Sequence, residues 1–178
     1  NHGIAVAYAG WMAKVPATIF VPEGVSPLKA EKIKGYGAKL VVGGEHFAEA
    51  NAAALDLAKR DGLAYFHPYE DPAVIAGQGT LSLEILADDP AIDTMLVAIG
   101  GGGLIAGMAL WFEAHRPQTQ MFGVQTVGCP SMRAAVRGEE PPALQTLTLA
   151  DGIAVKRPGK LTTPILARRC EDILLVGE

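Results

Sequence analysis

The sequence VAIGGGGLIAG at residues 97–107 decides the expected fold. An apolar run ends in four glycines, Gly100, Gly101, Gly102 and Gly103, and an apolar helical pattern begins at once with Leu104. Residues without a Cβ atom let backbone N–H groups approach a small anion, and the N-terminus of the following helix adds a partial positive charge. The segment therefore predicts a strand, a phosphate-binding turn and a helix. A sharp turn in which glycine only permits close packing is the alternative.

Short apolar runs alternate with longer helical patterns on both sides of this segment. The runs are apolar throughout, as the strands of a parallel sheet covered by helices are. They lie at residues 17–21, 40–42, 63–66, 94–99, 120–124 and 173–176. Helical patterns lie at residues 1–9, 26–36, 47–61, 71–86 and 104–114, and from 163 onward, with Gly62 as the expected C-cap of the third. This alternation predicts a doubly wound α/β fold with a mostly parallel sheet.

Composition excludes several classes of protein. Of the 178 residues, 49% are apolar and 19% are charged, which is the opposite of a disordered chain. The net charge of −4 and the absence of a basic run argue against nucleic acid or an anionic membrane as partner. No apolar stretch approaches the ~18 residues of a membrane-spanning helix. With no targeting pattern, we expect a soluble, cytoplasmic protein.

The arrangement of the glycines narrows the class of phosphorylated ligand. It is not the G-x-G-x-x-G pattern with a later acidic residue that binds dinucleotides. It also lacks the G-K-[ST] ending of a loop that binds nucleoside triphosphates. A compact monophosphate, either a cofactor or a substrate, remains.

Several short motifs occur in the order found in one known family. They are NHG (1–3), PEG (22–24), KGYGA (34–38), HPYEDP (67–72), IAGQGT (75–80), the four glycines and ADGIAV (150–155). Together they resemble the fold type II pyridoxal-phosphate enzymes, most closely the threonine (serine/threonine) dehydratases, over nearly the whole chain. The resemblance implies pyridoxal 5′-phosphate as cofactor and conversion of L-threonine to 2-oxobutanoate and ammonia, or of L-serine to pyruvate. It also implies three-layer α/β sheets in two domains, as in the tryptophan synthase β fold, and a homo-oligomer, a dimer or a tetramer.

The resemblance assigns cofactor contacts to particular residues. Asn1 matches an asparagine that hydrogen-bonds the ring hydroxyl of the cofactor. Gly100 to Gly103 and Leu104 match the phosphate loop, and Gly152 matches a glycine beside the cofactor ring. Without the resemblance, Asn1 would be interpreted as a helix cap.

Two parts of the family pattern are absent from this sequence. The family's Schiff-base lysine precedes the asparagine motif, whereas every lysine here follows Asn1, so we assign no catalytic residue. The C-terminal segment whose serine or cysteine contacts the pyridine nitrogen is also absent, and Cys170 comes too early to replace it. We therefore expect an internal fragment, inactive by itself, with residues 1–65 forming most of the small domain and 66–178 part of the large one. Its sheets should expose apolar surface and make the isolated chain prone to aggregate.

Metal binding is not expected. Some relatives hold a divalent cation through acidic residues, and Gln125 and Ser131 stand in the corresponding places. Hard cations prefer carboxylate oxygens, which these side chains lack. Two other functions stay open from the residues alone: an inactive module that binds a phosphate ligand, and an unrelated Rossmann-like nucleotide-binding domain.

Overall fold

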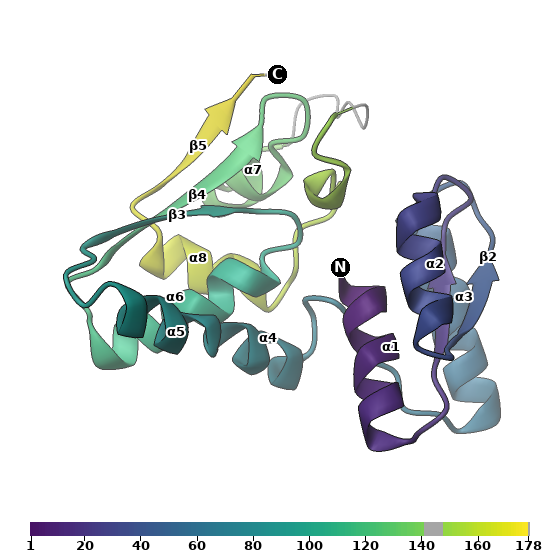
Figure 1. The fold of residues 1–178 in the computed structure, drawn as a ribbon. Coiled ribbons are helices and arrows are strands. Elements are labelled where there is room, and N and C mark those ends of the chain that lie inside the picture. The colour runs from purple at the N-terminus through teal and green to yellow at the C-terminus, as the bar shows by residue number, and fades with distance from the viewer. Residues whose placement is uncertain (141–147, 178) are drawn as a thin grey trace. The chain divides into compact units, whose positions relative to one another are not determined.

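The computed structural model describes residues 1–140 and 148–177 (Figure 1). The chain divides into two compact units, Asn1–Phe66 and His67–Glu178. This division lies one residue after the boundary expected from the sequence. That the units are the small and the large domain of the family stays a prediction.

The first unit contains a two-stranded parallel sheet and helices packed against it. Its elements are α1 (His2–Ala13), β1 (Thr18–Val21), α2 (Pro27–Gly35), β2 (Lys39–Val42) and α3 (Phe47–Asp61). The strands pair in register from Thr18 with Lys39 to Val21 with Val42. The core of this unit consists of small and branched side chains: Ala7, Ile19, Val21, Ile33 and Ala38. Helix α3 ends at Gly62, whose φ of 64° confirms the expected left-handed cap.

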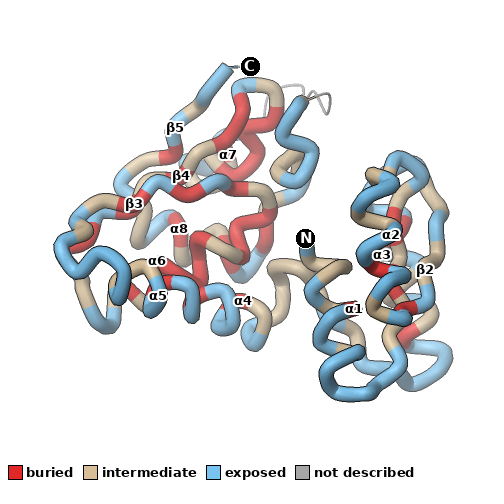
Figure 2. Tube along the Cα trace, in the orientation of Figure 1, coloured by how far each residue is buried: buried red, intermediate tan, exposed pale blue. Residues whose placement is uncertain are grey.

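The second unit contains a three-stranded parallel sheet in the order β3-β4-β5. Its elements are α4 (Pro72–Gly79), α5 (Leu81–Asp88), β3 (Thr94–Ala98), α6 (Gly103–His115), β4 (Gln120–Thr126), α7 (Ser131–Arg137), the 3₁₀ turn η1 (Asp151–Ile153), α8 (Thr162–Arg169) and β5 (Asp172–Val176). Helices α4, α5, α6 and α8 lie together on one side of the strands (Figure 1). Buried residues concentrate in α6, α7 and the strand positions that face them (Figure 2).

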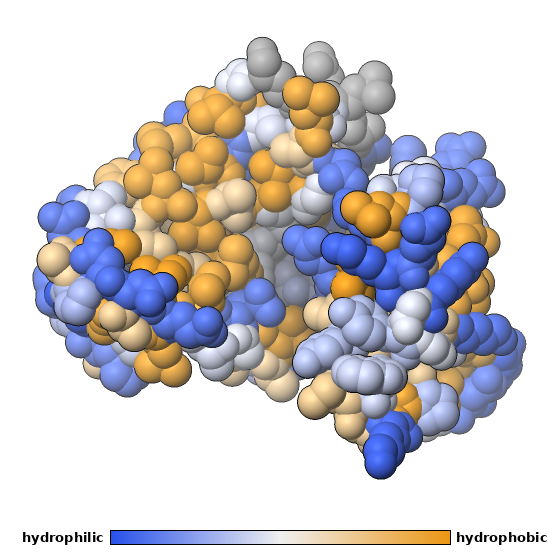
Figure 3. Space-filling view, viewed as in Figure 1, coloured by the Kyte–Doolittle hydropathy of each residue, from blue (hydrophilic) through white to orange (hydrophobic). Residues whose placement is uncertain are grey.

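One face of this sheet is buried and the other is exposed. Side chains alternate between the two faces of each strand. On the buried face, Met95 of β3, Met121 of β4 and Ile173 of β5 pack with the apolar helices. On the opposite face, Leu96 is 62% exposed and Leu174 is 39% exposed. Apolar side chains gather over the strands in the space-filling view (Figure 3). The expected exposure of apolar sheet surface is confirmed. A third layer of helices is not found on this sheet within residues 67–140 and 148–177.

Three features differ from the sequence-based expectations. Residues 63–66 form no strand; they are apolar, but a strand needs a pairing partner, and no described strand lies beside them. The single helix expected over 71–86 is two helices. They separate at Thr80, because its N–H and its hydroxyl both donate to the Gly77 carbonyl. Helix α7 was not expected, because residues 131–137 were assigned to none of the helical patterns.

No helix among the described residues is long and apolar enough to cross a membrane.

Candidate functional site

The four glycines connect β3 to α6, which confirms the predicted strand, turn and helix. The N–H of Ile99 donates to the Val124 carbonyl at 2.8 Å, so pairing with β4 continues to the edge of the loop. Gly102 is the N-cap of α6 and has a φ of +93°, a left-handed conformation that favours glycine. We call residues 100–103 the glycine loop.

At each residue of the glycine loop, neighbouring atoms lie close to the position that a Cβ atom would occupy. A Cβ on Gly101 would overlap the ring of Tyr69, and one on Gly102 would lie 2.7 Å from Met132 Cε. A Cβ on Gly103 would lie 3.1 Å from the Pro68 carbonyl, and one on Gly100 would lie 3.1 Å from Val155 Cγ2. Close packing, the alternative interpretation of the glycines, therefore has a structural basis.

The same loop also carries free hydrogen-bond donors. The backbone N–H groups from Gly100 to Ile105 have no hydrogen-bond acceptor within residues 1–140 and 148–177. Helical bonding begins only with Ala106, whose N–H donates to the Gly102 carbonyl at 2.9 Å. These donors stand at the positive end of the α6 dipole, which is the usual arrangement of an anion site. Packing and anion binding are thus compatible, because packing fills the Cβ directions and leaves the donors unused.

The structure brings Gly152 to the glycine loop. Gly152 lies in η1, and its carbonyl oxygen is 3.3 Å from the place where a Gly100 Cβ would stand. Leu104, in the first turn of α6, is half-buried against the core of the second unit. Two of the predicted groups, the glycine loop with Leu104 and the Gly152 turn, are therefore neighbours.

Asn1 belongs to the first unit. It is the N-cap residue of α1, and its side chain makes no capping hydrogen bond. The interpretation of Asn1 as a side-chain cap is therefore not supported. Its predicted contact with the cofactor stays a prediction.

The two residues considered for a metal have protein partners. Gln125 is fully buried; its Nε2 donates to the Ile99 carbonyl at 3.3 Å, and its Oε1 accepts from the Arg133 N–H at 3.0 Å. The Ser131 hydroxyl donates to the Val155 carbonyl at 2.5 Å. Both side chains thus hold backbone segments around the glycine loop. That the protein binds no metal stays an expectation.

Sequence reasoning missed the residues that surround the loop. Tyr69, Met132 and Thr162 all contact it, and they lie roughly 30 to 60 residues away along the chain. The HPYEDP motif at 67–72 marked the region of Tyr69 but not its position over Gly101. His67, in the same motif, accepts hydrogen bonds at Nδ1 from the N–H groups of Tyr69 and Glu70, so it orders this turn.

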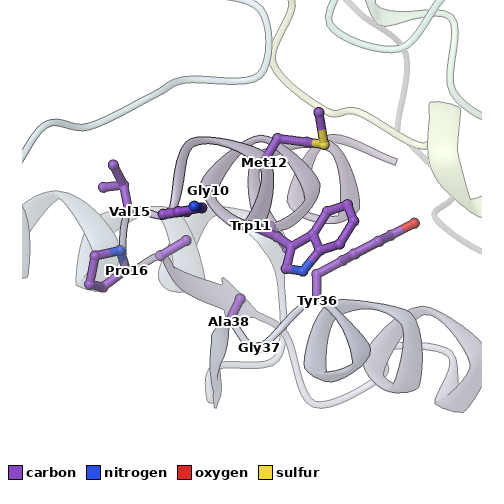
Figure 4. A pocket seen from close by; sticks show the side chains of 11 residues that line it. Gly10, Trp11, Met12, Val15, Pro16, Tyr36, Gly37 and Ala38 are labelled. Carbon is purple, nitrogen blue, oxygen red and sulfur yellow. The ribbon is translucent and has the colours of Figure 1, made fainter.

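A separate cavity lies in the first unit (Figure 4). Its volume is about 520 Å³, and it is bounded by the end of α1 and the turn after α2. Trp11 and Tyr36 lie side by side in its lining, with ring centroids 6.0 Å apart. The lining is mostly apolar and includes none of the predicted site residues, so we assign it no ligand.

A parallel α/β unit with unused N–H groups at a glycine-rich strand-to-helix turn has the donor arrangement of an anion site. The chain belongs to the pyridoxal-phosphate-dependent enzyme family, which it matches over residues 1–178. This membership excludes the alternative of an unrelated Rossmann-like domain.

Relatives and solved structures agree on this family. The chain is 42% identical to an L-threonine ammonia-lyase of Geobacter sulfurreducens, over all of this chain and 44% of the relative. Threonine deaminase isoform 2 of Solanum lycopersicum matches with a TM-score of 0.89 and 35% identity, over 99% of this chain and 52% of that one. Maize serine racemase matches with a TM-score of 0.90 and 31% identity, over 99% of this chain and 54% of the racemase chain. The chain spans about half the length of the relatives it matches.

Proposed function

We propose that this chain is the phosphate-anchoring part of a pyridoxal-phosphate-dependent L-threonine ammonia-lyase. The observation that carries the proposal is the row of unused N–H groups from Gly100 to Ile105 at the start of α6. The identity of 42% to a threonine ammonia-lyase supports the reaction class. The substrate is then L-threonine, or L-serine, and the enzyme is a dimer or a tetramer.

The residues present fit pyridoxal phosphate. The donors of the glycine loop suit a phosphate dianion, and no lysine or arginine is needed when several N–H groups converge. Gly152 would contact the cofactor ring, and Asn1 would hydrogen-bond the ring hydroxyl. Leu104 supplies one of the N–H groups that follow the glycines.

The work of this chain is to bind and orient. Pyridoxal phosphate held there would supply the electron sink that stabilises negative charge at the α-carbon of the substrate. The glycine loop fixes the phosphate, and with it the direction of the ring, because the loop is held by packing on several sides. No residue of this chain is assigned as the base.

The direct test measures products with the full-length protein that carries this chain. We expect 2-oxobutanoate from L-threonine, with pyruvate from L-serine as the second substrate. Gly102→Ala should lower pyridoxal phosphate affinity, because the positive φ of residue 102 is unfavourable for alanine and the new Cβ would overlap Met132. A protein that releases neither keto acid while binding the cofactor would support the inactive phosphate-binding module instead.

Amino-acid racemisation is the second candidate. Maize serine racemase has a TM-score of 0.90 to this chain, as close as the threonine deaminase structure. Its identity of 31% is lower than the 42% of the ammonia-lyase, which is why the lyase is preferred. Chiral chromatography after incubation with L-serine decides between them, since D-serine formed faster than pyruvate would reverse the preference.

A further inference from the structure

A buried hydroxyl holds the glycine loop from behind. Thr162, the first residue of α8, is fully buried, and its Oγ1 donates to the Gly101 carbonyl at 2.6 Å. The N–H of Gly159 donates to the same carbonyl at 3.3 Å. The Gly101 carbonyl is therefore bound twice by a segment that lies about 60 residues further along the chain.

The position of this carbonyl sets the direction of a ligand-binding donor. A trans peptide unit is planar, so the carbonyl of one residue and the N–H of the next point in opposite directions. When Thr162 holds the Gly101 carbonyl toward α8, the N–H of Gly102 points away from α8. That N–H is one of the donors without an acceptor among the described residues.

Two further carbonyls of the loop are held in the same way. Buried Gln125 donates to the Ile99 carbonyl, which directs the N–H of Gly100 away from β4. The N–H of Ala106 holds the Gly102 carbonyl, which fixes the N–H of Gly103. Thr162 and Gln125 are the side chains that do this, since the third bond belongs to the helix.

We propose that Thr162 is a positioning residue for phosphate binding. Glycine crosses between backbone conformations with little steric cost, so an unheld Gly101–Gly102 peptide unit can rotate. Rotation would replace the Gly102 N–H with the Gly101 carbonyl oxygen and present a partial negative charge to the anion. The Thr162 hydroxyl, which makes the shorter of the two hydrogen bonds to the Gly101 carbonyl, opposes this rotation. The proposal rests on the glycine loop being the phosphate site of the proposed function.

The test compares two ligands that differ only in the phosphate group. Equilibrium binding of pyridoxal phosphate and of pyridoxal is measured with the full-length protein and three variants. Thr162→Val removes the hydroxyl and keeps the shape, whereas Thr162→Ser keeps the hydroxyl. Thr163→Val is the matched control, because the Thr163 hydroxyl donates to the Gly159 carbonyl and to Met132 Sδ and makes no hydrogen bond to residues 100–103.

Loss of one oriented donor to a charged group should weaken pyridoxal phosphate binding about tenfold in Thr162→Val. Pyridoxal affinity should change less than about twofold, and Thr162→Ser and Thr163→Val should keep both affinities. Equal loss of both ligands in Thr162→Val, or the same selective loss in Thr163→Val, would overturn the proposal. A wild-type protein with no preference for the phosphorylated ligand would overturn the proposed site as well.

A measurement on the wild-type protein covers the case in which Thr162→Val does not fold. With ¹⁵N-glycine labelling, the Gly102 amide proton should move downfield when pyridoxal phosphate is added and stay in place when pyridoxal is added. Thr162→Ser should give the same shift. A Gly102 amide that responds equally to both ligands would refute the role of Thr162.

Discussion

Gly79 of α4 and Gly107 of α6 lie so close together that neither has room for a Cβ. A Cβ on Gly79 would stand 2.7 Å from the Gly107 carbonyl oxygen, and one on Gly107 would stand 2.7 Å from the Gly79 nitrogen. The two helices therefore meet backbone to backbone. Because α4 begins at Pro72, this crossing also helps to place Tyr69 over Gly101.

Gly107→Ala should destabilise the protein. The new methyl group would overlap the Ile75 carbonyl and push α4 from α6, at a cost of about 1–3 kcal/mol for overpacking. Urea unfolding of the full-length protein measures the loss. Gly77→Ala is the matched control, since Gly77 lies in the same helix pair with nothing within 4 Å of its Cβ position. It should be neutral, or more stable by up to about 1 kcal/mol through helix propensity. Equal free energies of unfolding for the two variants would contradict the close contact.

Local patterns predicted the local parts of this fold. The turn from β3 through the glycines to α6 follows from adjacent residues, because glycine content and apolar periodicity act over a few positions. Residues 63–66 show the limit: their apolar composition suits a strand, but pairing depends on a neighbour that composition does not reveal.

The candidate site was predictable in part for the same reason. The anion-binding loop is contiguous in sequence, whereas the side chains that hold it come from distant segments. Tyr69 precedes the loop by about 30 residues, and Thr162 follows it by about 60. Threonine and tyrosine are common in loops and helix starts, so nothing in their own neighbourhood marks them as contacts of the glycines.

Gly152→Ala should separate a cofactor role from a packing role. A Cβ on Gly152 meets nothing within 4 Å, so stability should stay unchanged. If the cofactor ring lies beside Gly152 as proposed, the methyl group takes part of its space, and pyridoxal phosphate affinity should fall several-fold. Titration by absorbance and thermal melting measure the two effects. Gly24→Ala is the control with an equally open Cβ position. Wild-type affinity in Gly152→Ala would remove Gly152 from the site.

Cys170 should react slowly with alkylating reagents. Burial disfavours the thiolate and raises the pKa of the Cys170 thiol from 9.0 to about 11. At pH 9 about one hundredth of it is ionised, against about half for an ordinary thiol, so iodoacetamide should react roughly 50-fold more slowly than in the urea-unfolded protein. The Cys129→Ser variant leaves Cys170 as the cysteine that mass spectrometry follows. A folded-state rate that levels off near pH 9 would contradict the raised pKa.

Polar substitutions on the exposed sheet face should make the isolated chain less prone to aggregate and the full-length protein less stable. Leu96 and Leu174 lie on the face that no described helix covers, and Thr keeps the strand preference while removing apolar surface. In the isolated 178-residue chain, Leu96→Thr with Leu174→Thr should reduce light scattering on concentration without lowering the melting temperature. In the full-length protein, where we propose that further segments cover this face, the same pair should lower the melting temperature because both side chains lose buried contacts.

Leu149→Thr, at a leucine that is 93% exposed outside the sheet, is the control and should leave the melting temperature unchanged in both the isolated chain and the full-length protein. If the pair left the melting temperature of the full-length protein unchanged, the face would be exposed there too, and the proposed covering segments would be wrong.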